Sequence, residues 1–451
     1  MSKKIEMNLT NGVLWKQILA FSFPLMISNI LQVLFNISDI AVVGKFAGPL
    51  ALGAVGSTAT LVTLFTGTLI GLSGGINVLT AIAIGHNFKK DIKETVHSAA
   101  IISLIVGILL MIGGIVFSKD ILVLLHTKSK LLEGAVSYLH IYFLGLPALA
   151  LYNFGNAVFS ASGDTKRPLM YLSISGVLNV VLNMIFVIAF HLNVYGVAMA
   201  SVISQYLSAF LIVRDLFRSQ ELYAMCIREL KITKDKAIRI LELGIPAGLQ
   251  AAIFCIANLF VQMGVNSFDA TVVAGNSAAA NADALIYDIM AAFYTACGSY
   301  MGQNIGAKKK ERVWRSYILS LAYSFLIALL LGGLLVLFSS QFLSLFTNDR
   351  AVIDAGMERL KIMGLSYCVS AFMDCTIAAS RALGKALVPT IVVILGSCVF
   401  RVAWIYTIFA HFQTTTSLYL LYVFSWTITA IAEIIYFARI YKKSMHAICT
   451  C

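Results

Sequence analysis

The chain has 451 residues, of which 59% are hydrophobic and only 12% are charged, and its net charge at pH 7 is +12. Soluble globular proteins carry about 25% charged residues, so a chain this apolar has too few polar side chains to cover a water-facing surface. The composition therefore excludes a soluble globular protein and indicates an integral membrane protein.

Twelve apolar runs follow one another along the chain, and each is long enough to cross a hydrocarbon core of about 30 Å as a helix. Backbone groups in lipid must be satisfied internally, so such runs must be helical. The runs cover residues 16–43, 52–84, 95–117, 137–160, 168–190, 196–214, 241–267, 271–301, 315–338, 362–381, 387–410 and 417–438. We predict an all-α polytopic membrane protein with twelve transmembrane helices.

Basic residues are distributed unevenly between the two sides of these runs. The termini and the connections after every second run carry 25 of the 33 Lys and Arg residues, and the opposite side carries seven. Three of those seven, Arg350, Arg359 and Lys361, lie between the ninth and tenth runs, and Arg401 lies inside a run. Because positive loops stay cytoplasmic, we expect both termini inside. The positive charge alternates by loop and forms no nucleic-acid-binding motif, so no nucleic acid partner is expected.

Three sequence features of the first half recur in the second half at a nearly constant separation. The pairs are Phe23-Pro24 with Ile245-Pro246, Gly85-His86-Asn87 with Gly302-Gln303-Asn304, and Gly163 to Pro168 with Gly384 to Pro389. Six helices return each half to the same side, so the copies are parallel, as in transporters whose pathway lies between two repeats. We predict an N-lobe at 1–215, a cytoplasmic linker at 216–240 and a C-lobe at 241–451.

Two prolines lie inside predicted helices. Pro24 and Pro246 each remove a backbone hydrogen bond about two turns into a run, so each helix should bend there. The bend is either a moving hinge or a static kink that fits the packing.

Polar side chains form stripes along several runs of the first half. Gln32, Asn36 and Asp39 are spaced i, i+4 and i+7 and share one helix face. Similar pairs are Asn153 with Asn156 and Asn179 with Asn183, and Ser201 lies at the depth of Asp39 and Asn183. We expect these faces to converge inside the first half. One carboxylate among neutral oxygens could bind Na⁺, with Asp39, Asn179 and Asn183 as ligands, or take up H⁺, because burial disfavours the charged form. The alternative is a structural network that holds helices together.

The second half also has charged residues inside its runs. Asp374 and Arg401 lie at similar depth, so a buried ion pair that locks the packing is one interpretation. Asp283 and Asp288 lie on different faces of one helix, and we expect at least one to face a central cavity and attract a cationic ligand. With Asp374, they are the substrate-pocket residues predicted in this half. No cysteine–histidine spacing in the sequence predicts a metal site. The only metal ion considered is Na⁺ at Asp39, Asn179 and Asn183.

These features together resemble the multidrug and toxic compound extrusion (MATE) transporters. The resemblance covers nearly the whole chain and depends on four stretches, which are Pro24 with Asn36 to Gly44, Ser162 to Thr165, Leu178 to Asn183, and Gly302 to Ala307. It implies two six-helix lobes that export drugs by alternating access in exchange for H⁺ or Na⁺, without a cofactor. It also implies a monomer in a prokaryotic plasma membrane, with the lipid bilayer and a small-molecule substrate as its partners.

The resemblance also assigns roles to residues. Asp39, Asn179, Asn183 and Ser201 are similar to the N-lobe cation site of the family, and Tyr138 is similar to a tyrosine near it. Gln32, Asn153 and Asn156 are similar to residues that line the N-lobe pocket. Members of the DinF-like branch usually have Asp where this chain has Asn183, which leaves Asp39 to carry the coupling. The NorM-like branch has Glu where this chain has Phe254, so the chain resembles the DinF-like branch more closely.

Two other functions fit the sequence less well than export. A lipid-linked oligosaccharide flippase should line its cavity with several Arg and Lys, and only Arg401 is clearly within a run. A membrane enzyme needs a nucleophile, histidine or paired-carboxylate constellation at one depth, and the histidines lie mostly in loops or at helix ends. We therefore expect a transporter and not an enzyme.

Overall fold

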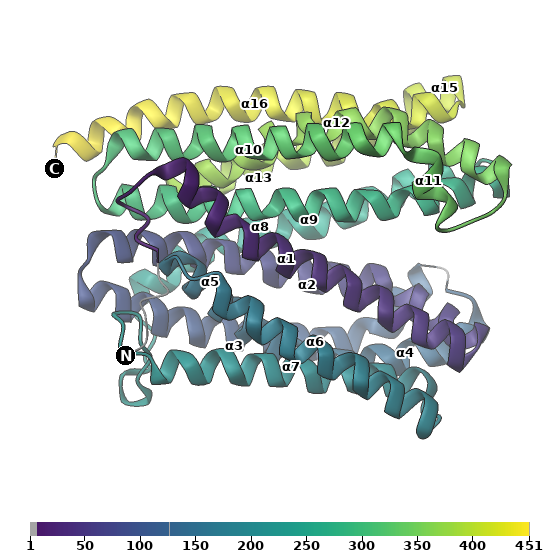
Figure 1. Ribbon diagram of the computed structural model, residues 1–451, viewed down its shortest axis with the longest axis horizontal. Coiled ribbons are helices and arrows are strands. Elements are labelled where there is room, and N and C mark those ends of the chain that lie inside the picture. The colour runs from purple at the N-terminus through teal and green to yellow at the C-terminus, as the bar shows by residue number, and fades with distance from the viewer. Residues whose placement is uncertain (1–6, 126, 451) are drawn as a thin grey trace. The chain divides into compact units, whose positions relative to one another are not determined.

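The computed structural model describes residues 7–125 and 127–450. Within these ranges every regular element is a helix, and the order in Figure 1 follows the predicted runs. The first half contains α1 (Leu14–Val42), the π-helix η1 (Val43–Ala47), α2 (Pro49–His86), α3 (Lys89–Leu124), α4 (Ser129–Phe143), α5 (Leu146–Ser162), α6 (Lys166–Met184), the π-helix η2 (Ile185–Ala189) and α7 (Asn193–Arg218).

The second half begins after a short 3₁₀-helix, η3 (Ile227–Glu229). It contains α8 (Lys234–Val265), α9 (Ala270–Gly306), α10 (Lys310–Leu337), α11 (Ser339–Ser344), α12 (Arg350–Ala382), α13 (Leu387–Val393), the π-helix η4 (Ile394–Val399), α14 (Phe400–Trp404), the π-helix η5 (Ile405–Phe409), α15 (Ala410–Phe412) and α16 (Thr415–Thr450).

The helices account for all twelve predicted spans. Among the described residues, ten helices are long and apolar enough to cross a membrane, and an eleventh span forms if α4 and α5, which meet at a 47° bend, are taken together. The remaining predicted span is α9, which has 37 residues but carries Asn276, Asp283 and Asp288 along its length. The all-α polytopic fold is confirmed, and the polar α9 is the span that apolarity alone detects least well.

The helices group into two units. The first contains Ile27–Gly248 and the described residues before Leu9, and the second contains Leu9–Met26 and the chain from Leu249 onward. Both divisions lie just beyond a proline, since Pro24 precedes Met26 and Pro246 precedes Gly248. Both α1 and α8 continue as helices through their prolines. Residues 216–240, predicted as a linker, group with the first unit.

The repeat is visible in the backbone as well as in the sequence. Left-handed residues end corresponding helices in the two halves, and the separation within each pair is constant to within one residue. The sequence motifs Gly85 to Asn87 and Gly302 to Asn304 are closer together than these left-handed pairs by about one helical turn. The reason is that Gly302 to Asn304 lie before the end of α9. That motif pair is therefore out of structural register. The pairs in register are Asn87 with Lys308, Gly163 with Gly384, and His191 with Gln413.

The turn between α5 and α6 shows why one of these motifs has its sequence. Gly163 has φ +96°, and a Cβ there would lie 2.3 Å from the carbonyl oxygen of Met7. Asp164, which precedes the N-cap residue Thr165, accepts hydrogen bonds from the backbone N–H groups of Lys166 (3.0 Å) and Arg167 (3.2 Å) and so satisfies two of the free donors at the start of α6. Burial raises the pKa of Asp164 above its ordinary value, although these donors and the Arg167 guanidinium oppose the shift.

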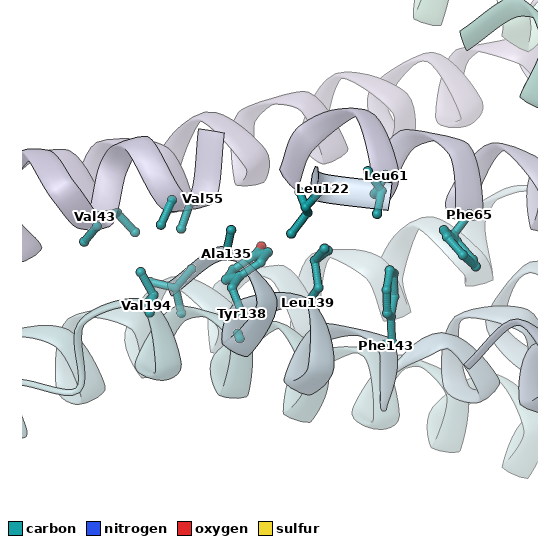
Figure 2. Close-up of a cluster of buried hydrophobic side chains, with 14 of the residues drawn as sticks. Val43, Val55, Leu61, Phe65, Leu122, Ala135, Tyr138, Leu139, Phe143 and Val194 are labelled. Carbon is teal, nitrogen blue, oxygen red and sulfur yellow. The ribbon is translucent and has the colours of Figure 1, made fainter. Parts of the chain in front are cut away.

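Each unit has its own apolar core. In the first unit, Figure 2 shows Tyr138, Leu139 and Phe143 of α4 pointing toward side chains of α2, α3 and α7. In the second unit, α12 packs against α9, α10 and α16, and α10, α12 and α16 run side by side in Figure 1. The core of the first unit lies beside the candidate site described next.

Candidate cation site in the first unit

Asp39 lies at the centre of a polar cluster on α1, α6 and α7. Its Oδ1 accepts a 2.5 Å hydrogen bond from Asn183 Nδ2, and its Oδ2 accepts one of 3.3 Å from Ser201 Oγ. Asn183 Nδ2 also donates to Asn179 Oδ1 at 3.3 Å, and Asn179 Nδ2 donates to Ser201 Oγ at 3.5 Å. The structure therefore brings four of the predicted cation-site residues into one hydrogen-bonded network.

Helix geometry explains why these residues meet. Asn179 and Asn183 are four residues apart, so one face of α6 presents both amides. The same face cannot point into lipid at low cost, and both asparagines are buried, with exposures of 6% and 0%. The helices α6 and α7 pack against each other, which brings Ser201 to the same place.

A cavity of about 280 Å³ opens next to this network. It is lined by seven of the predicted site residues, which are Gln32, Asn36, Asp39, Tyr138, Asn153, Asn179 and Ser201. Asn183 contacts Asp39 but does not line the cavity. Asn156 is half-buried on α5 and does not line it either. The polar stripes of α1 and α5 therefore converge, except at Asn156.

Two groups of lining residues were missed by the sequence-based prediction. Tyr142 lies one turn after Tyr138, and the two rings stack with centroids 5.8 Å apart. On α7, Ser204, Gln205 and Ser208 line the cavity beside Ser201. Their spacing of three, four and seven residues from Ser201 is a helical polar stripe, so the pattern that identified the α1 face could also have identified this one.

The network combines one carboxylate with neutral oxygen and nitrogen groups. Among the described residues, no cluster of three or more His, Cys, Asp or Glu side chains could hold a metal ion. Asp39 supplies one carboxylate, and its hydrogen-bond donors are neutral amide and hydroxyl groups. Asn183 Oδ1 is buried and has no hydrogen-bond partner. An unsatisfied oxygen next to a carboxylate is a ligand that Na⁺ can use after a rotation of the amide.

In the second unit, Asp283 has a cationic partner. Its carboxylate forms an ion pair with Arg359 and accepts a hydrogen bond from Tyr367. Arg359 also donates to Asn276 Oδ1 at 2.5 Å. Arg359, which the sequence analysis assigned to the connection between the ninth and tenth runs, lies on α12, which begins at Arg350, and it is 5% exposed.

The other charged residues predicted in this half are arranged differently from the expected pair. Arg401 Nη1 donates to Asn258 Oδ1 at 3.1 Å, and its Nε donates to Ser425 Oγ at 3.2 Å. No carboxylate of the described residues lies within 4.0 Å of Arg401, so the expected ion pair with Asp374 is absent there. Asp288 and Asp374 are half-buried on α9 and α12.

Comparisons with known proteins agree with this architecture. The MatE family profile matches the chain twice, at residues 24–185 and 246–407, so each match starts at one of the two helix prolines. The chain belongs to the MATE family of multidrug efflux transporters. Because the two matches have the same length and begin at corresponding prolines, the MATE profile also confirms the parallel repeat. Proteins of the MATE family are membrane transporters, and the chain is a multi-span member of it.

Individual MATE proteins are similar over most of their length. A Bacillus subtilis protein described as probable multidrug resistance protein YpnP is 31% identical over 361 residues, which cover 79% of this chain and 80% of that protein. The multidrug export protein MepA of Staphylococcus saprophyticus is 22% identical over 394 residues, or 85% of each chain. The outward-facing structure of a multidrug resistance MATE transporter has a TM-score of 0.89 and 23% identity, and the match covers 100% of both chains.

Proposed function

We propose that this MATE transporter is a secondary antiporter that exports small, mainly cationic organic compounds in exchange for H⁺ or Na⁺. Alternating access would carry substrate out of the cytoplasm of a prokaryotic cell across its plasma membrane. The excess of Lys and Arg on one side supports cytoplasmic termini. The multidrug resistance proteins similar to this chain favour drug export over a lipid-linked oligosaccharide flippase.

One observation carries the coupling role. Asp39 is a carboxylate in the membrane-spanning part of the first unit, its hydrogen-bond donors Asn183 and Ser201 are neutral, and it lines a cavity. A carboxylate charge in such surroundings is costly, and binding H⁺ or Na⁺ neutralises it. Antiport requires only that the bound cation and the substrate favour different states of the transporter. Asp39 supplies a group whose charge depends on the bound cation.

The predicted residues around Asp39 and the two prolines also have roles in this proposal. Asn179, Asn183, Ser201 and Tyr138 would shape the cation site, and Gln32, Asn36 and Asn153 would line the path between cation and substrate. Pro24 and Pro246 would act as hinges, since each removes one backbone hydrogen bond within a long helix. We expect a monomer, and the resemblance to the DinF-like branch stays a prediction.

The test measures export of a cationic fluorescent dye from proteoliposomes under H⁺ or Na⁺ gradients imposed separately. Asp39→Asn should abolish gradient-driven export, because the neutral amide does not exchange charge with the cation. The matched control is Glu433→Gln, which removes a buried carboxylate from α16 and should retain export. Undiminished gradient-driven export by Asp39→Asn would contradict the coupling role.

A further inference from the structure

The linker between α7 and α8 is fixed to the start of α3. The backbone N–H of Cys226 donates a hydrogen bond to His97 Nε2 at 3.0 Å. The backbone N–H of Thr233 donates to Ser98 Oγ, also at 3.0 Å. Both of these α3 residues are buried, although they lie within the first turns of a helix that begins at Lys89. The linker therefore covers the start of α3 and does not extend away from it.

The side of α3 that the linker covers is the side that faces lipid further along the helix. With about 100° per residue, the two covered residues and the exposed Leu104, Ile105 and Ile108 lie within about 120° of one another around the helix axis. These exposed residues belong to a helix that is long and apolar enough to cross a membrane. The rise from Ser98 to Leu104 is about 9 Å. The linker therefore lies at the depth of the lipid headgroups, just outside the hydrocarbon core.

Residues 227–234 of the linker, here called the interfacial strip, expose three large apolar side chains. Ile227 is 73% exposed, Ile232 is 47% exposed and Leu230 is 37% exposed. Removing an apolar side chain of this size from water is favourable by about 1.5–3 kcal/mol. At the depth that α3 gives to the strip, the boundary between headgroups and acyl chains can supply this burial without a change of fold.

Basic residues alternate with the apolar ones in the interfacial strip. Arg228, Lys231 and Lys234 are exposed, and no carboxylate of the described residues lies within 4.0 Å of them. The acidic residue of the strip, Glu229, is paired with Lys93, with 2.5 Å between Oε2 and Nζ. The strip therefore presents three positive charges beside its apolar side chains. Each such charge near an anionic membrane surface contributes roughly 1 kcal/mol of attraction.

We propose that the interfacial strip is a membrane anchor that binds the headgroups of anionic phospholipids in the cytoplasmic leaflet. Its basic residues pair with the phosphates, and its apolar side chains enter the boundary between headgroups and acyl chains. Apolar burial and electrostatic attraction together determine how strongly an interfacial segment binds a membrane. A soluble anion would satisfy the charges but leave the apolar side chains in water. The anchor goes beyond the export function, because it involves neither the cation site nor the substrate.

The first test measures the preference for an anionic lipid. The full-length transporter in detergent is titrated with phosphatidylglycerol or phosphatidylcholine, and native mass spectrometry gives an apparent Kd for each lipid. The wild type should bind phosphatidylglycerol more tightly. The triple variant Arg228→Gln, Lys231→Gln and Lys234→Gln should bind it about a hundredfold more weakly, because three charges at roughly 1 kcal/mol each are lost, and its binding of phosphatidylcholine should not change. Equal affinity of the wild type for the two lipids would overturn the proposal.

A second triple variant is the matched control for the loss of positive charge. Lys308→Gln, Lys310→Gln and Lys443→Gln remove three exposed basic residues of the second unit. This variant should bind phosphatidylglycerol as the wild type does, and a thermal midpoint near that of the wild type should show that both triple variants are folded. Equal losses of affinity in the two triple variants would overturn the proposal, because net charge and not the strip would then attract the lipid.

A third experiment tests whether the apolar side chains enter the bilayer. Ile227→Trp places a fluorophore in the strip, and in nanodiscs its emission, taken as the excess over the wild type, should be quenched by phospholipids brominated on their acyl chains. Quenching by iodide from the water phase without quenching by the brominated lipid would overturn the anchor. The double variant Ile227→Asn and Ile232→Asn keeps the charge and should weaken binding of both lipids by about tenfold or more.

A competition experiment separates a lipid headgroup from a soluble anion. Inorganic phosphate, added at the same concentration as the lipid in the titration, should leave phosphatidylglycerol bound, because it cannot replace the apolar contacts. Displacement of the lipid by inorganic phosphate would overturn the assignment to the membrane and would indicate a site for soluble anions.

Discussion

Asp39 and Val261 lie 222 residues apart, as Pro24 and Pro246 do, so they occupy the same place in the two copies of the repeat, but their surroundings differ in charge. In the first unit, a carboxylate is held by two neutral donors beside a cavity lined by asparagine, serine and tyrosine. In the second unit, Arg401 stands 222 residues after Asn179, the separation of the two prolines. Arg359 stands 221 residues after Tyr138, which is the separation of Asn87 from Lys308 and of Gly163 from Gly384 on either side of it. A repeated backbone thus supplies two equivalent scaffolds, and the side chains decide which charge each can bind.

The largest expected effect comes from giving the first unit the charge of the second. Asn183 donates hydrogen bonds to both Asp39 and Asn179, so the two residues lie close together. Asn179→Arg should therefore place a guanidinium beside Asp39. Opposite charges about 4 Å apart attract by roughly 4 kcal/mol at an effective dielectric constant of about 20, which corresponds to about a thousandfold lower affinity for a competing cation. Dye export under an imposed gradient should fall to the level of empty liposomes.

The uncharged variant Asn179→Gln is the control for crowding at this position, and it should keep measurable export. A thermal midpoint similar to that of the wild type would show that Asn179→Arg is folded. If folded Asn179→Arg protein exported dye at the wild-type rate, the two sites would not differ through charge.

A second experiment tests whether Arg359 and Asp283 act as a pair. Each is buried or mostly buried, with side-chain exposures of 6% and 24%. Removing one partner leaves the other uncompensated, so Asp283→Asn and Arg359→Gln should each destabilise the protein by about 3 kcal/mol. The double variant should lose less than the sum, because neither charge is then left alone.

The measurement is the free energy of unfolding of the detergent-solubilised protein, or its thermal midpoint as a substitute. The matched change in the first unit is Tyr138→Phe at the position that repeats Arg359, and it should have a much smaller effect. Additive losses in the double variant would show that the two side chains contribute independently.

A smaller effect is expected from the donor to Asp39. Asn183→Ala removes the 2.5 Å hydrogen bond that stabilises the carboxylate charge. The carboxylate then gains more from binding a proton, so the proton concentration that half-saturates H⁺-driven transport should fall about tenfold, since hydrogen bonds to charged groups contribute roughly 1.5–3 kcal/mol. For Na⁺-driven transport the half-saturating concentration should rise instead, because the variant also loses the amide oxygen that Na⁺ could bind. Transport assayed over a series of Na⁺ concentrations and pH values measures both constants, and unchanged values for both ions would contradict a role of Asn183 at this site.

The smallest predicted effect compares the same turn in the two halves. Gly163 and Gly384 both have positive φ, at +96° and +77°, so Ala should cost about 1 kcal/mol at either position. Only Gly163 lies close to another backbone atom, since a Cβ there would meet the carbonyl oxygen of Met7, whereas Gly384 has nothing within 4 Å. Gly163→Ala should therefore lower the thermal midpoint more than Gly384→Ala. Equal losses would contradict a tight packing of Met7 on this turn.

Much of the fold could be predicted because its signals are local. Apolar runs located the twelve spans to within several residues at most ends, and nearly constant separations identified the repeat. Prediction was weaker where helices are long but polar. The start of α12 was missed by about three turns because Arg350 and Arg359 precede the apolar run, and apolarity cannot recognise charges that are neutralised by a distant partner.

The candidate site was predictable in part for the same reason. The stripes Gln32–Asn36–Asp39 and Asn179–Asn183 have helical spacing, so the sequence predicts that each set shares one helix face. It does not predict which residues these faces contact. Asp283 and Arg359 lie 76 residues apart on α9 and α12, and no local pattern connects them. Tyr142 and the serines of α7 were missed although their spacing was visible in the sequence.

The sequence by itself determined the membrane-spanning helices, their duplication and the polar face that contains Asp39, since hydrophobicity, periodicity and repetition are properties of the chain. Only the tertiary structure decided which polar groups meet. It joined Asp39 to Asn183 and Ser201 across three helices. It paired Asp283 with Arg359 and gave Arg401 the neutral hydrogen-bond partners Asn258 and Ser425 among aromatic rings. The reason is physical: a buried charge is stabilised by whichever groups lie within a few ångströms, and helix packing, not sequence distance, sets those neighbours.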